Sequence, residues 1–526
     1  MKNLCRMALM VCVLAAWSVP MVGGSARLSE SVQEIRLANG FTALVVPRHQ
    51  APFFSAVIYV DAGGVDEELG ESGSAHLLEH MAFKGTPWIG TRDWASERKL
   101  LTEIEQIAEE IVAENTKATP DQATLARLRA RLSELQKEAA QFVVPNEYDQ
   151  IITRAGGQEI NATTSKDWTN YFMTLPSNRL ELWAMMESER LTYPAWREFY
   201  KERDVVAEER RMRTEDSPAG RLYEEFIVGA FKAHPYGTPV IGWMNDLENL
   251  TVRRTANFYH RYYRPDNMVA VLVGDLDSTQ VKPILEKYFG SLPKGAQATR
   301  RLPIEPPQNS FRKIEVPFDA QPQVLIGWHK PTYPDRDAYV FEVLQYLLTA
   351  NGRSARLFER LVKKDGLCES VECFTAPGDK YPNLFCIWMT PRAPHTAQEV
   401  QSVLWEELER LKRDPVTTEE LEKTRNQIDA SFLRELESNL GFARRLGAYY
   451  LLTRDAHALD KFRDAMKSVT AEEIQAVAQR YFTRDNTTVA EIVPKSRLSA
   501  TPKVEEARDR ASAPLTTSTK PSSSAK

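Results

Sequence analysis

Cysteine and histidine are scarce in this chain of 526 residues, which contains five cysteines and eight histidines. Cys5 and Cys12 lie in the apolar N-terminal segment, so Cys368, Cys373 and Cys386 are the only cysteines in the rest of the sequence. Three cysteines allow one disulfide and leave one thiol, which excludes a fold held together by several disulfides. Their spacing predicts neither a zinc ribbon nor a catalytic cysteine.

Long hydrophobic runs are also missing. The longest uncharged apolar run covers residues 8–19, which is shorter than the roughly 18 residues expected of a transmembrane helix. Lys2 and Arg6 precede this run, and Gly24-Ser-Ala26 follows it with small residues. This arrangement predicts a secretory signal peptide over residues 1–26 and a periplasmic or secreted protein without a membrane span. The alternative is an N-terminal anchor that is never cleaved.

The chain has no excess of positive charge, because its formal net charge is −5. Loss of the signal peptide would remove two more basic residues, Lys2 and Arg6, and no acidic ones. A mildly acidic protein is not expected to bind nucleic acid, which requires a basic face. Residues 496–526 are dominated by small and polar residues with few large apolar groups, and we expect a disordered tail there.

Two of the few histidines stand four residues apart, in His76-Leu-Leu-Glu79-His80. On a helix, residues i and i+4 lie on the same face, so both imidazoles can bind one metal ion. Glu79 is placed to hold and deprotonate a water on that metal. The order H-x-x-E-H is the inverted zinc-protease motif. The alternative is a pair of surface histidines on an amphipathic helix.

The surrounding sequence predicts a short helix behind a strand. Residues 54–60 are β-branched and aromatic, which is typical of a strand. Ser72-Gly-Ser-Ala75 offers N-cap residues immediately before His76, and Lys84-Gly-Thr-Pro87 ends the helix. A rigid, well-delimited element of this kind suits a metal site.

Catalytic zinc usually has three protein ligands, so a third ligand is needed. The best candidates lie in the charged run from Glu202 to Glu209, which lacks Gly and Pro and predicts a helix. Glu202 and Glu209 are nearly two turns apart and share a face, whereas Glu208 points about 100° away from Glu209. The alternative is a solvated acidic helix with ion pairs to Arg203, Arg210 and Arg211.

These segments together resemble the M16 metallopeptidases. The matching segments are His76–His80, Gly156-Gly-Gln-Glu-Ile-Asn161-Ala162, and the run from Glu202 to Glu209, over roughly residues 30–495. The resemblance implies that His76, His80 and Glu209 bind one Zn²⁺ per chain. It also implies that Glu79 is the general base, that Glu202 is a second functional glutamate, and that Asn161 and Ala162 lie on an edge strand that pairs with the substrate backbone.

An internal repeat predicts two homologous halves. Tyr262-Tyr-Arg-Pro-Asp-Asn267 and the apolar run after it are echoed by Tyr481-Phe-Thr-Arg-Asp-Asn486 and the run that follows. The same offset places Thr251 onto Thr470. We therefore expect an α+β fold with two tandem domains, each a mixed sheet with flanking helices: a zinc-bearing domain over 27–290 and a second domain without the zinc motif over 300–495.

Residues 93–141 predict an antiparallel helical hairpin inserted into the first domain. Leu125, Leu128, Leu132 and Leu135 recur at helical spacing, and Thr119-Pro120-Asp121 offers an N-cap and a first-turn proline for the second helix. The hairpin is either a surface elaboration or an arm for docking a partner.

The second half departs from the family pattern. The family places an arginine and a tyrosine, which contact the substrate and the oxyanion, where this chain has Val362 and Glu369. Neither side chain donates a hydrogen bond at neutral pH, and Arg360 lies two residues away, on the wrong side of a helix. We therefore expect a secreted zinc endopeptidase that cleaves peptides or unfolded segments and pairs with a homologous subunit or a second copy of itself. The alternative is a non-catalytic assembly subunit.

Overall fold

The computed structural model describes residues 28–295, 300–350 and 352–498. The predicted signal peptide lies outside these residues, and so does the tail from residue 499. The first residues of the predicted tail form a short helix, α17 (Lys495–Leu498), so the described part of that tail is ordered. No helix within the described residues is long and apolar enough to cross a membrane.

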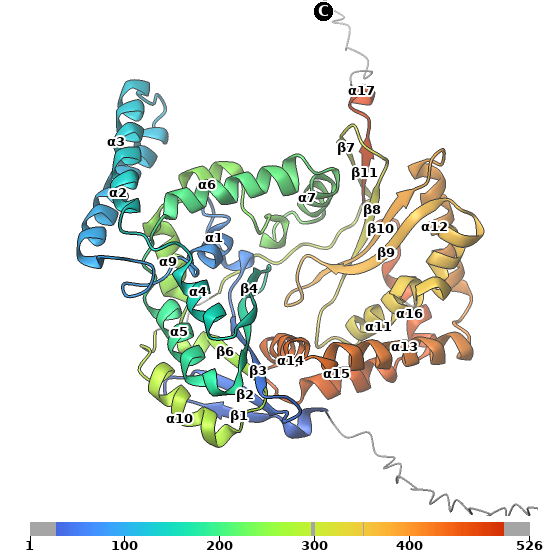
Figure 1. Cartoon of the computed structure of the whole chain (residues 1–526). Helices are drawn as coiled ribbons and strands as arrows, with labels where there is room; N and C mark the ends of the chain where they lie inside the picture. Colours follow the sequence, from blue (N-terminus) through green and yellow to red (C-terminus); the bar gives the residue numbers. More distant parts are fainter. Residues whose placement is uncertain (1–27, 296–299, 351, 499–526) are drawn as a thin grey trace, which may run out of the picture.

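Two sheets organise the chain, one in each half (Figure 1). The first has the strand order β1-β2-β6-β3-β5-β4, and the second has the order β7-β11-β8-β10-β9. Both are mixed, because β2 and β6 run parallel, as do β7 and β11, while the other neighbours are antiparallel. The α+β prediction is confirmed. The strands are β1 (Gln33–Arg36), β2 (Thr42–Pro47), β3 (Phe53–Val60), β4 (Gln158–Thr164), β5 (Thr169–Pro176), β6 (Met268–Gly274), β7 (Arg312–Pro317), β8 (Val324–Lys330), β9 (Cys368–Ala376), β10 (Asn383–Pro391) and β11 (Thr487–Val493).

Helices surround both sheets (Figure 1). The first half contains α1 (Ser74–Met81), α2 (Trp94–Asn115), α3 (Gln122–Ala140), α4 (Glu147–Arg154), α5 (Leu180–Thr192), α6 (Phe199–Arg210), α7 (Pro218–Ala230), α8 (Met244–Asn249), α9 (Val252–Tyr262) and α10 (Ser278–Phe289). The second half contains α11 (Arg336–Gln345), α12 (Ala397–Arg413), α13 (Thr418–Glu437), α14 (Asn439–Thr453), α15 (Ala458–Lys467) and α16 (Ala471–Tyr481).

The repeat seen in the sequence is a repeat in structure. Asn267 donates from Nδ2 to the carbonyl of Tyr262 at 2.9 Å, and Asn486 donates to the carbonyl of Tyr481 at 3.0 Å. Each asparagine also reaches the end of the strand beside it, at Asp61 or His329. The asparagines therefore tie the helix before each central strand to the neighbouring strand in both halves.

The predicted hairpin is present as α2 and α3, which pack together and project from the first half (Figure 1). Leu125, Leu128 and Leu135 are buried in it, as the spacing predicted. The N-cap of α3 is Asp121, whose side chain accepts from the backbone N of Ala123, so the predicted first-turn proline was wrong. Pro120 lies before the cap, outside the helix.

Helix α14 of the second half covers one face of the first sheet. Along β3, Phe54 and Ile58 face a core formed with the helices of the first half, whereas Val57 and Tyr59 face α14. A Cβ on Gly447 of α14 would lie 2.3 Å from the Tyr59 ring, so only glycine allows this contact. Because both faces of the sheet are buried, β3 is apolar except for Ser55 and does not alternate between apolar and polar residues.

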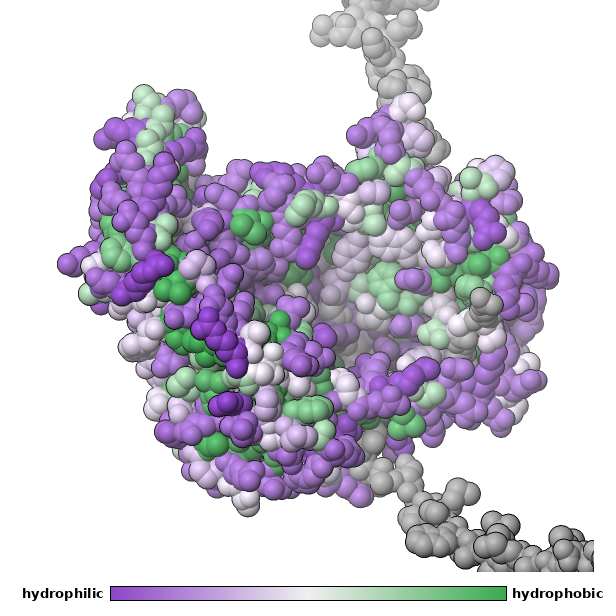
Figure 2. All heavy atoms as spheres, viewed as in Figure 1, coloured by the Kyte–Doolittle hydropathy of each residue, from purple (hydrophilic) through white to green (hydrophobic). Residues whose placement is uncertain are grey.

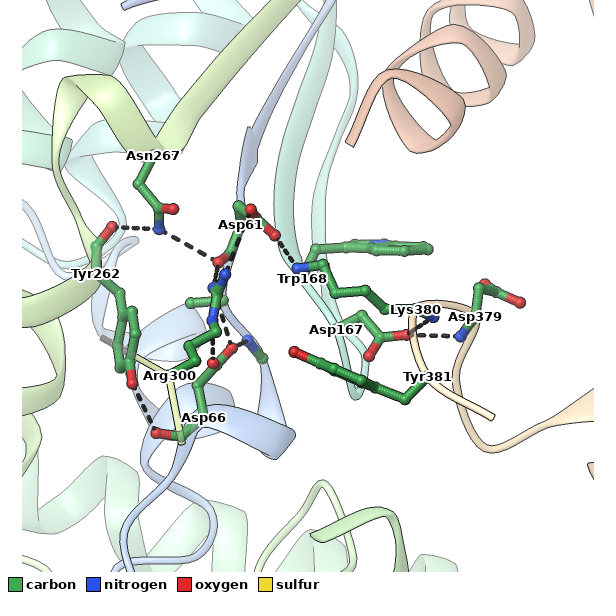
Figure 3. A network of polar contacts seen from close by, with 12 residues as sticks. Asp61, Asp66, Asp167, Trp168, Tyr262, Asn267, Arg300, Asp379, Lys380 and Tyr381 are labelled. Carbon is green, nitrogen blue, oxygen red and sulfur yellow. Dashed lines mark hydrogen bonds and ion pairs between the residues drawn. The ribbon is translucent and has the colours of Figure 1, made fainter. Parts of the chain in front are cut away.

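Asp61, at the end of β3, lies where the two halves and their connecting segment meet (Figure 3). Its side chain is 5% exposed and accepts from Lys380 of the β9–β10 loop and from Arg454 after α14. Arg300 of the connecting segment lies 3.5 Å from the same carboxylate. One carboxylate of the first half thus holds cations from three separate segments.

Two further aspartates extend this network (Figure 3). Asp66 accepts from Arg300 Nε at 2.5 Å. Asp167 accepts from the backbone N atoms of Asp379, at 2.6 Å, and Lys380, at 3.1 Å. The β9–β10 loop of the second half is therefore fixed against the first half by both main-chain and side-chain bonds.

Candidate metal centre

Helix α1 carries the two histidines, and its N-cap lies within the predicted segment Ser72-Gly-Ser-Ala75. The serines at 72 and 74 do not cap it; Gly73 is the N-cap, with a φ of 90°. Glu67 accepts hydrogen bonds on Oε1 from the backbone N atoms of Gly73, at 3.1 Å, and Ala75, at 2.8 Å. A carboxylate that binds two free amide groups and faces the positive end of the helix dipole serves as the cap.

Three side chains converge on one point beside α1. His76 Nε2 lies 3.8 Å from Glu209 Oε1, and His80 Nε2 lies 3.5 Å from Glu209 Oε2. The ligand atoms of the three residues all lie within 4.8 Å of one another. The two His–Glu209 separations, 3.8 and 3.5 Å, are long for hydrogen bonds but close to the roughly 3.4 Å between ligands about 2.1 Å from a tetrahedral zinc ion.

Helix α6 supplies the third group, Glu209, while the neighbouring Glu208 points away from the site. Glu209 is 13% exposed and faces the histidines, whereas Glu208 is 59% exposed and bonds Arg211 at 2.7 Å. The structure therefore places Glu202 and Glu209 on the face that contacts α1 and Glu208 outside it. The predicted helical register is the one observed.

Glu202 contacts His80 at Nδ1, the ring nitrogen that does not face Glu209. Its Oε1 lies 3.0 Å from His80 Nδ1, and its Oε2 accepts from Lys84 Nζ at 2.6 Å. Burial opposes ionisation of Glu202, but the hydrogen bonds from His80 and Lys84 outweigh it and lower its pKa to about 2. An ionised partner on Nδ1 leaves the lone pair of Nε2 directed at the metal position.

Burial keeps His76 in its neutral form. Burial, aided by the charges of His80 and Arg213, lowers the pKa of His76 to about 3. Its Nδ1 is buried and has no hydrogen-bond partner among the described residues. A neutral imidazole is the form that binds a metal.

Glu79 points from α1 towards the first sheet, where Thr164 of β4 donates to its Oε2 at 2.6 Å. Burial raises the pKa of Glu79, and the Thr164 hydrogen bond acts in the opposite direction. The carboxylate that the motif predicts as a base is thus fixed in orientation by a residue at the end of the neighbouring strand.

Strand β4 is the edge of the first sheet and pairs only with β5 in the part of the chain that the structure describes. Asn161 and Ala162 lie on it, and Asn161 Oδ1 accepts from the Ala162 backbone N at 2.8 Å. A cavity of about 540 Å³ next to this edge is lined by Asn161 together with Glu79, His80 and Glu202. The structure thus brings the predicted substrate-binding residues beside the predicted metal ligands.

The second half offers no donor at the two altered positions. Val362 packs against the core of the second half, and the Glu369 side chain is exposed. The guanidinium of Arg360 is engaged by three carboxylates, those of Asp365, Glu406 and Glu407. It is therefore not free to replace the missing arginine. Cys368, Cys373 and Cys386 are all buried free thiols, so the disulfide that the sequence allows is not formed.

Sequence reasoning missed Glu67, Lys84 and Thr164, each of which holds one of the predicted residues. Lys84 lies one turn after His80, a spacing that could have indicated it. Glu67 and Thr164 approach α1 only through the tertiary fold, so no spacing in the sequence indicates them.

Comparisons with known proteins agree with this site. A family model described as Insulinase (Peptidase family M16) matches residues 43–126, and one described as Peptidase M16 inactive domain matches residues 249–428. The zinc protease PqqE of Helicobacter pylori is 30% identical over 487 residues, which cover 88% of this chain and 93% of that protein. The chain belongs to the M16 family of zinc metallopeptidases.

Other relatives match most of this chain. The uncharacterized zinc protease YmxG of Bacillus subtilis is 26% identical over 431 residues, or 81% of this chain and 90% of YmxG. The crystal structure of a protease from Helicobacter pylori superposes with a TM-score of 0.73 at 28% identity, over 88% of this chain and 99% of that one. The periplasmic protease PqqL from Escherichia coli, at 18% identity and a TM-score of 0.65, shares the fold over 89% of this chain and 48% of its own.

Proposed function

We propose that this chain is a zinc-dependent endopeptidase that cleaves peptides or unfolded segments. The observation that carries the proposal is the convergence of His76, His80 and Glu209, with Glu79 beside them. We further propose a division into a zinc-bearing domain over 27–290 and a second domain over 300–495, in a protein exported by its N-terminal signal peptide. The H. pylori and B. subtilis relatives are named zinc proteases, which supports the activity.

His76, His80 and Glu209 would hold one zinc ion, since their donor atoms suit it and Glu202 orients His80 through its Nδ1 atom. Bound there, zinc supplies a Lewis acid that polarises a carbonyl and acidifies water. Glu79 takes the proton of the attacking water as the new C–O bond forms. It then gives that proton to the amide nitrogen as the C–N bond breaks, so Glu79 returns to its starting state.

The substrate would lie as an added strand along β4. Main-chain hydrogen bonds to an edge strand hold an extended peptide without selecting its sequence. Since the Ala162 backbone N is already bonded to the Asn161 side chain, the peptide must displace this side chain. Rotation of Asn161 towards the adjacent cavity would expose the Ala162 amide group.

A partner would complete the site. Val362 and Glu369 cannot provide the hydrogen bonds of the family arginine and tyrosine, and a second copy of this chain would lack them too, so we propose that a homologous subunit with these donors lies against the zinc-bearing half. Loss of one oxyanion donor typically costs about 10²–10³ in rate. The competing proposal, a non-catalytic assembly subunit, also draws on these two residues, but it leaves the ordered metal ligands and Glu79 without a role.

The test is the variant Glu79→Gln, assayed on a quenched peptide with and without the candidate partner. We expect bound zinc and folding to be retained and hydrolysis to be nearly abolished, because the proton acceptor is lost. Hydrolysis by Glu79→Gln at the wild-type rate would show that the motif is not responsible. Zinc-loaded wild-type protein that stays inactive with every homologous partner would favour the assembly role.

A further inference from the structure

Arg213 is a cation at the metal site that neither the motif nor the family pattern predicts. It lies four residues after Glu209, and its Nη1 donates to Glu209 Oε1, the oxygen that also faces His76. The two partners differ in exposure, because Arg213 is 73% exposed and Glu209 is 13% exposed. The guanidinium therefore reaches the metal-ligand cluster from the solvent side.

The local backbone places Arg213 there. Helix α6 continues into a π-helical segment, Arg211–Glu215, directly after Glu209. π-helical turns are rare and are frequent at functional sites. The turn requires glycine at position 220, because a Cβ there would lie 1.9 Å from the Arg213 carbonyl oxygen.

The same helix contains a matched ion pair that does not reach the site. Arg211 bonds Glu208 at 2.7 Å, and both side chains are about half exposed, 45% and 59%. A surface pair of this kind contributes little. Arg213 differs because its partner is a buried metal ligand, and its charge also acts on His76 and Glu79.

We propose that Arg213 contacts the substrate: on peptide binding its guanidinium turns from Glu209 to the carbonyl oxygen of the scissile bond and hydrogen bonds to it as negative charge develops. The inference rests on the proposed peptidase function. It explains how a chain with Val362 and Glu369 keeps a donor of its own, since Arg360 is engaged elsewhere. The exposure of Arg213 leaves room for the movement, and a guanidinium provides donors in a fixed geometry.

The test compares Arg213→Gln, Arg213→Lys and the control Arg211→Gln in the full mature chain, with three measurements. For a quenched peptide, we expect Arg213→Gln to lower kcat by about 10²–10³ with KM changed less than about threefold. Arg213→Lys should recover about tenfold, and Arg211→Gln should resemble the wild type. Zinc affinity, measured by chelator competition, should change less than about threefold in all three variants. A lower kcat with unchanged zinc affinity would indicate that Arg213 contacts the substrate. A residue that only supported Glu209 would lower zinc affinity as well.

The third measurement does not need turnover. A phosphinic peptide, which mimics the tetrahedral anion, should bind Arg213→Gln about 10²-fold more weakly than it binds the wild type. The parent peptide should bind the inactive variant Glu79→Gln and the double variant Glu79→Gln/Arg213→Gln equally well. Unchanged phosphinic-peptide affinity would overturn the proposal, and so would a fall in zinc affinity that matches the loss of rate. If the wild type does not cleave peptides at all, the proposed function fails, and phosphinic-peptide binding still decides the role of Arg213.

Discussion

Replacing Asp61 by asparagine should weaken the attachment between the two halves. The substitution keeps the shape of the side chain and the backbone carbonyl, but it removes the negative charge that faces Lys380, Arg300 and Arg454. Arg300 retains Asp66 at 2.5 Å, and Arg454 is 45% exposed and can be solvated. Lys380 is only 17% exposed and loses its direct ion pair, although the charges of Asp66 and Asp167 still act on it.

Removing one partner of a buried ion pair costs about 3–5 kcal/mol, and the two partly compensated arginines favour the lower end, about 3 kcal/mol. With an m-value of about 3 kcal/mol/M in urea, this corresponds to a lower midpoint by roughly 1 M. The matched control is Glu181→Gln, because the Glu181–Lys287 pair is exposed on both sides, 57% and 62%. We expect that change to cost less than about 1 kcal/mol.

The stability difference between the wild type and Asp61→Asn should depend on pH. Burial of Asp61 opposes its ionisation, but the charges of Lys380, Arg300 and Arg454 outweigh it and lower its pKa. A carboxyl with a lowered pKa in the folded state stabilises the protein above its unfolded pKa, and this contribution is lost as pH falls through the folded value. The stability difference between wild type and Asp61→Asn should therefore be constant above the ordinary carboxyl pKa of 3.8 and shrink as the pH is lowered below it.

A double mutant provides the decisive comparison. In Asp61→Asn/Lys380→Met the cation that lost its direct ion pair is gone, so the double mutant should be more stable than Asp61→Asn alone. Urea unfolding followed by tryptophan fluorescence measures the wild type, the single mutants Asp61→Asn and Lys380→Met, and the double mutant. If the effects of the two single substitutions simply add, the double mutant is the least stable chain. That result would refute the reasoning that Lys380 depends on Asp61.

Three further predictions concern the metal centre. Glu209→Gln should weaken zinc affinity by about 10²–10³, because one of the three protein ligands loses its charge; Glu208→Gln should leave zinc affinity unchanged, and equal losses would show that the wrong glutamate was chosen. Glu202→Gln should weaken zinc by about 10–100-fold, measured by chelator competition, and a larger effect than that of Glu209→Gln would make Glu202 the ligand. Thr164→Val removes the hydrogen bond that lowers the pKa of Glu79, so the acidic limb of the kcat/KM profile should move to higher pH; a shift to lower pH would contradict the assigned contact.

The sequence alone determined the parts of this protein that depend on short spacings. His76 and His80 are one turn apart, and the helical period placed Glu209 and Glu202 on one face and Glu208 outside it. The repeat around Asn267 and Asn486 predicted two halves because each copy makes the same local hydrogen bonds. Helical periodicity likewise predicted the hairpin of α2 and α3. These features follow from geometry within a few turns of chain.

Only the tertiary structure decided what surrounds the metal centre. Glu67 caps α1 because the fold brings its carboxyl group to two free amide groups at the start of the helix. Thr164 reaches Glu79 because β4 lies beside that helix. Asp61 pairs with Lys380, which lies 319 residues further along the chain. Such contacts depend on which elements pack together, and packing is chosen by the whole buried surface rather than by any local pattern of residues.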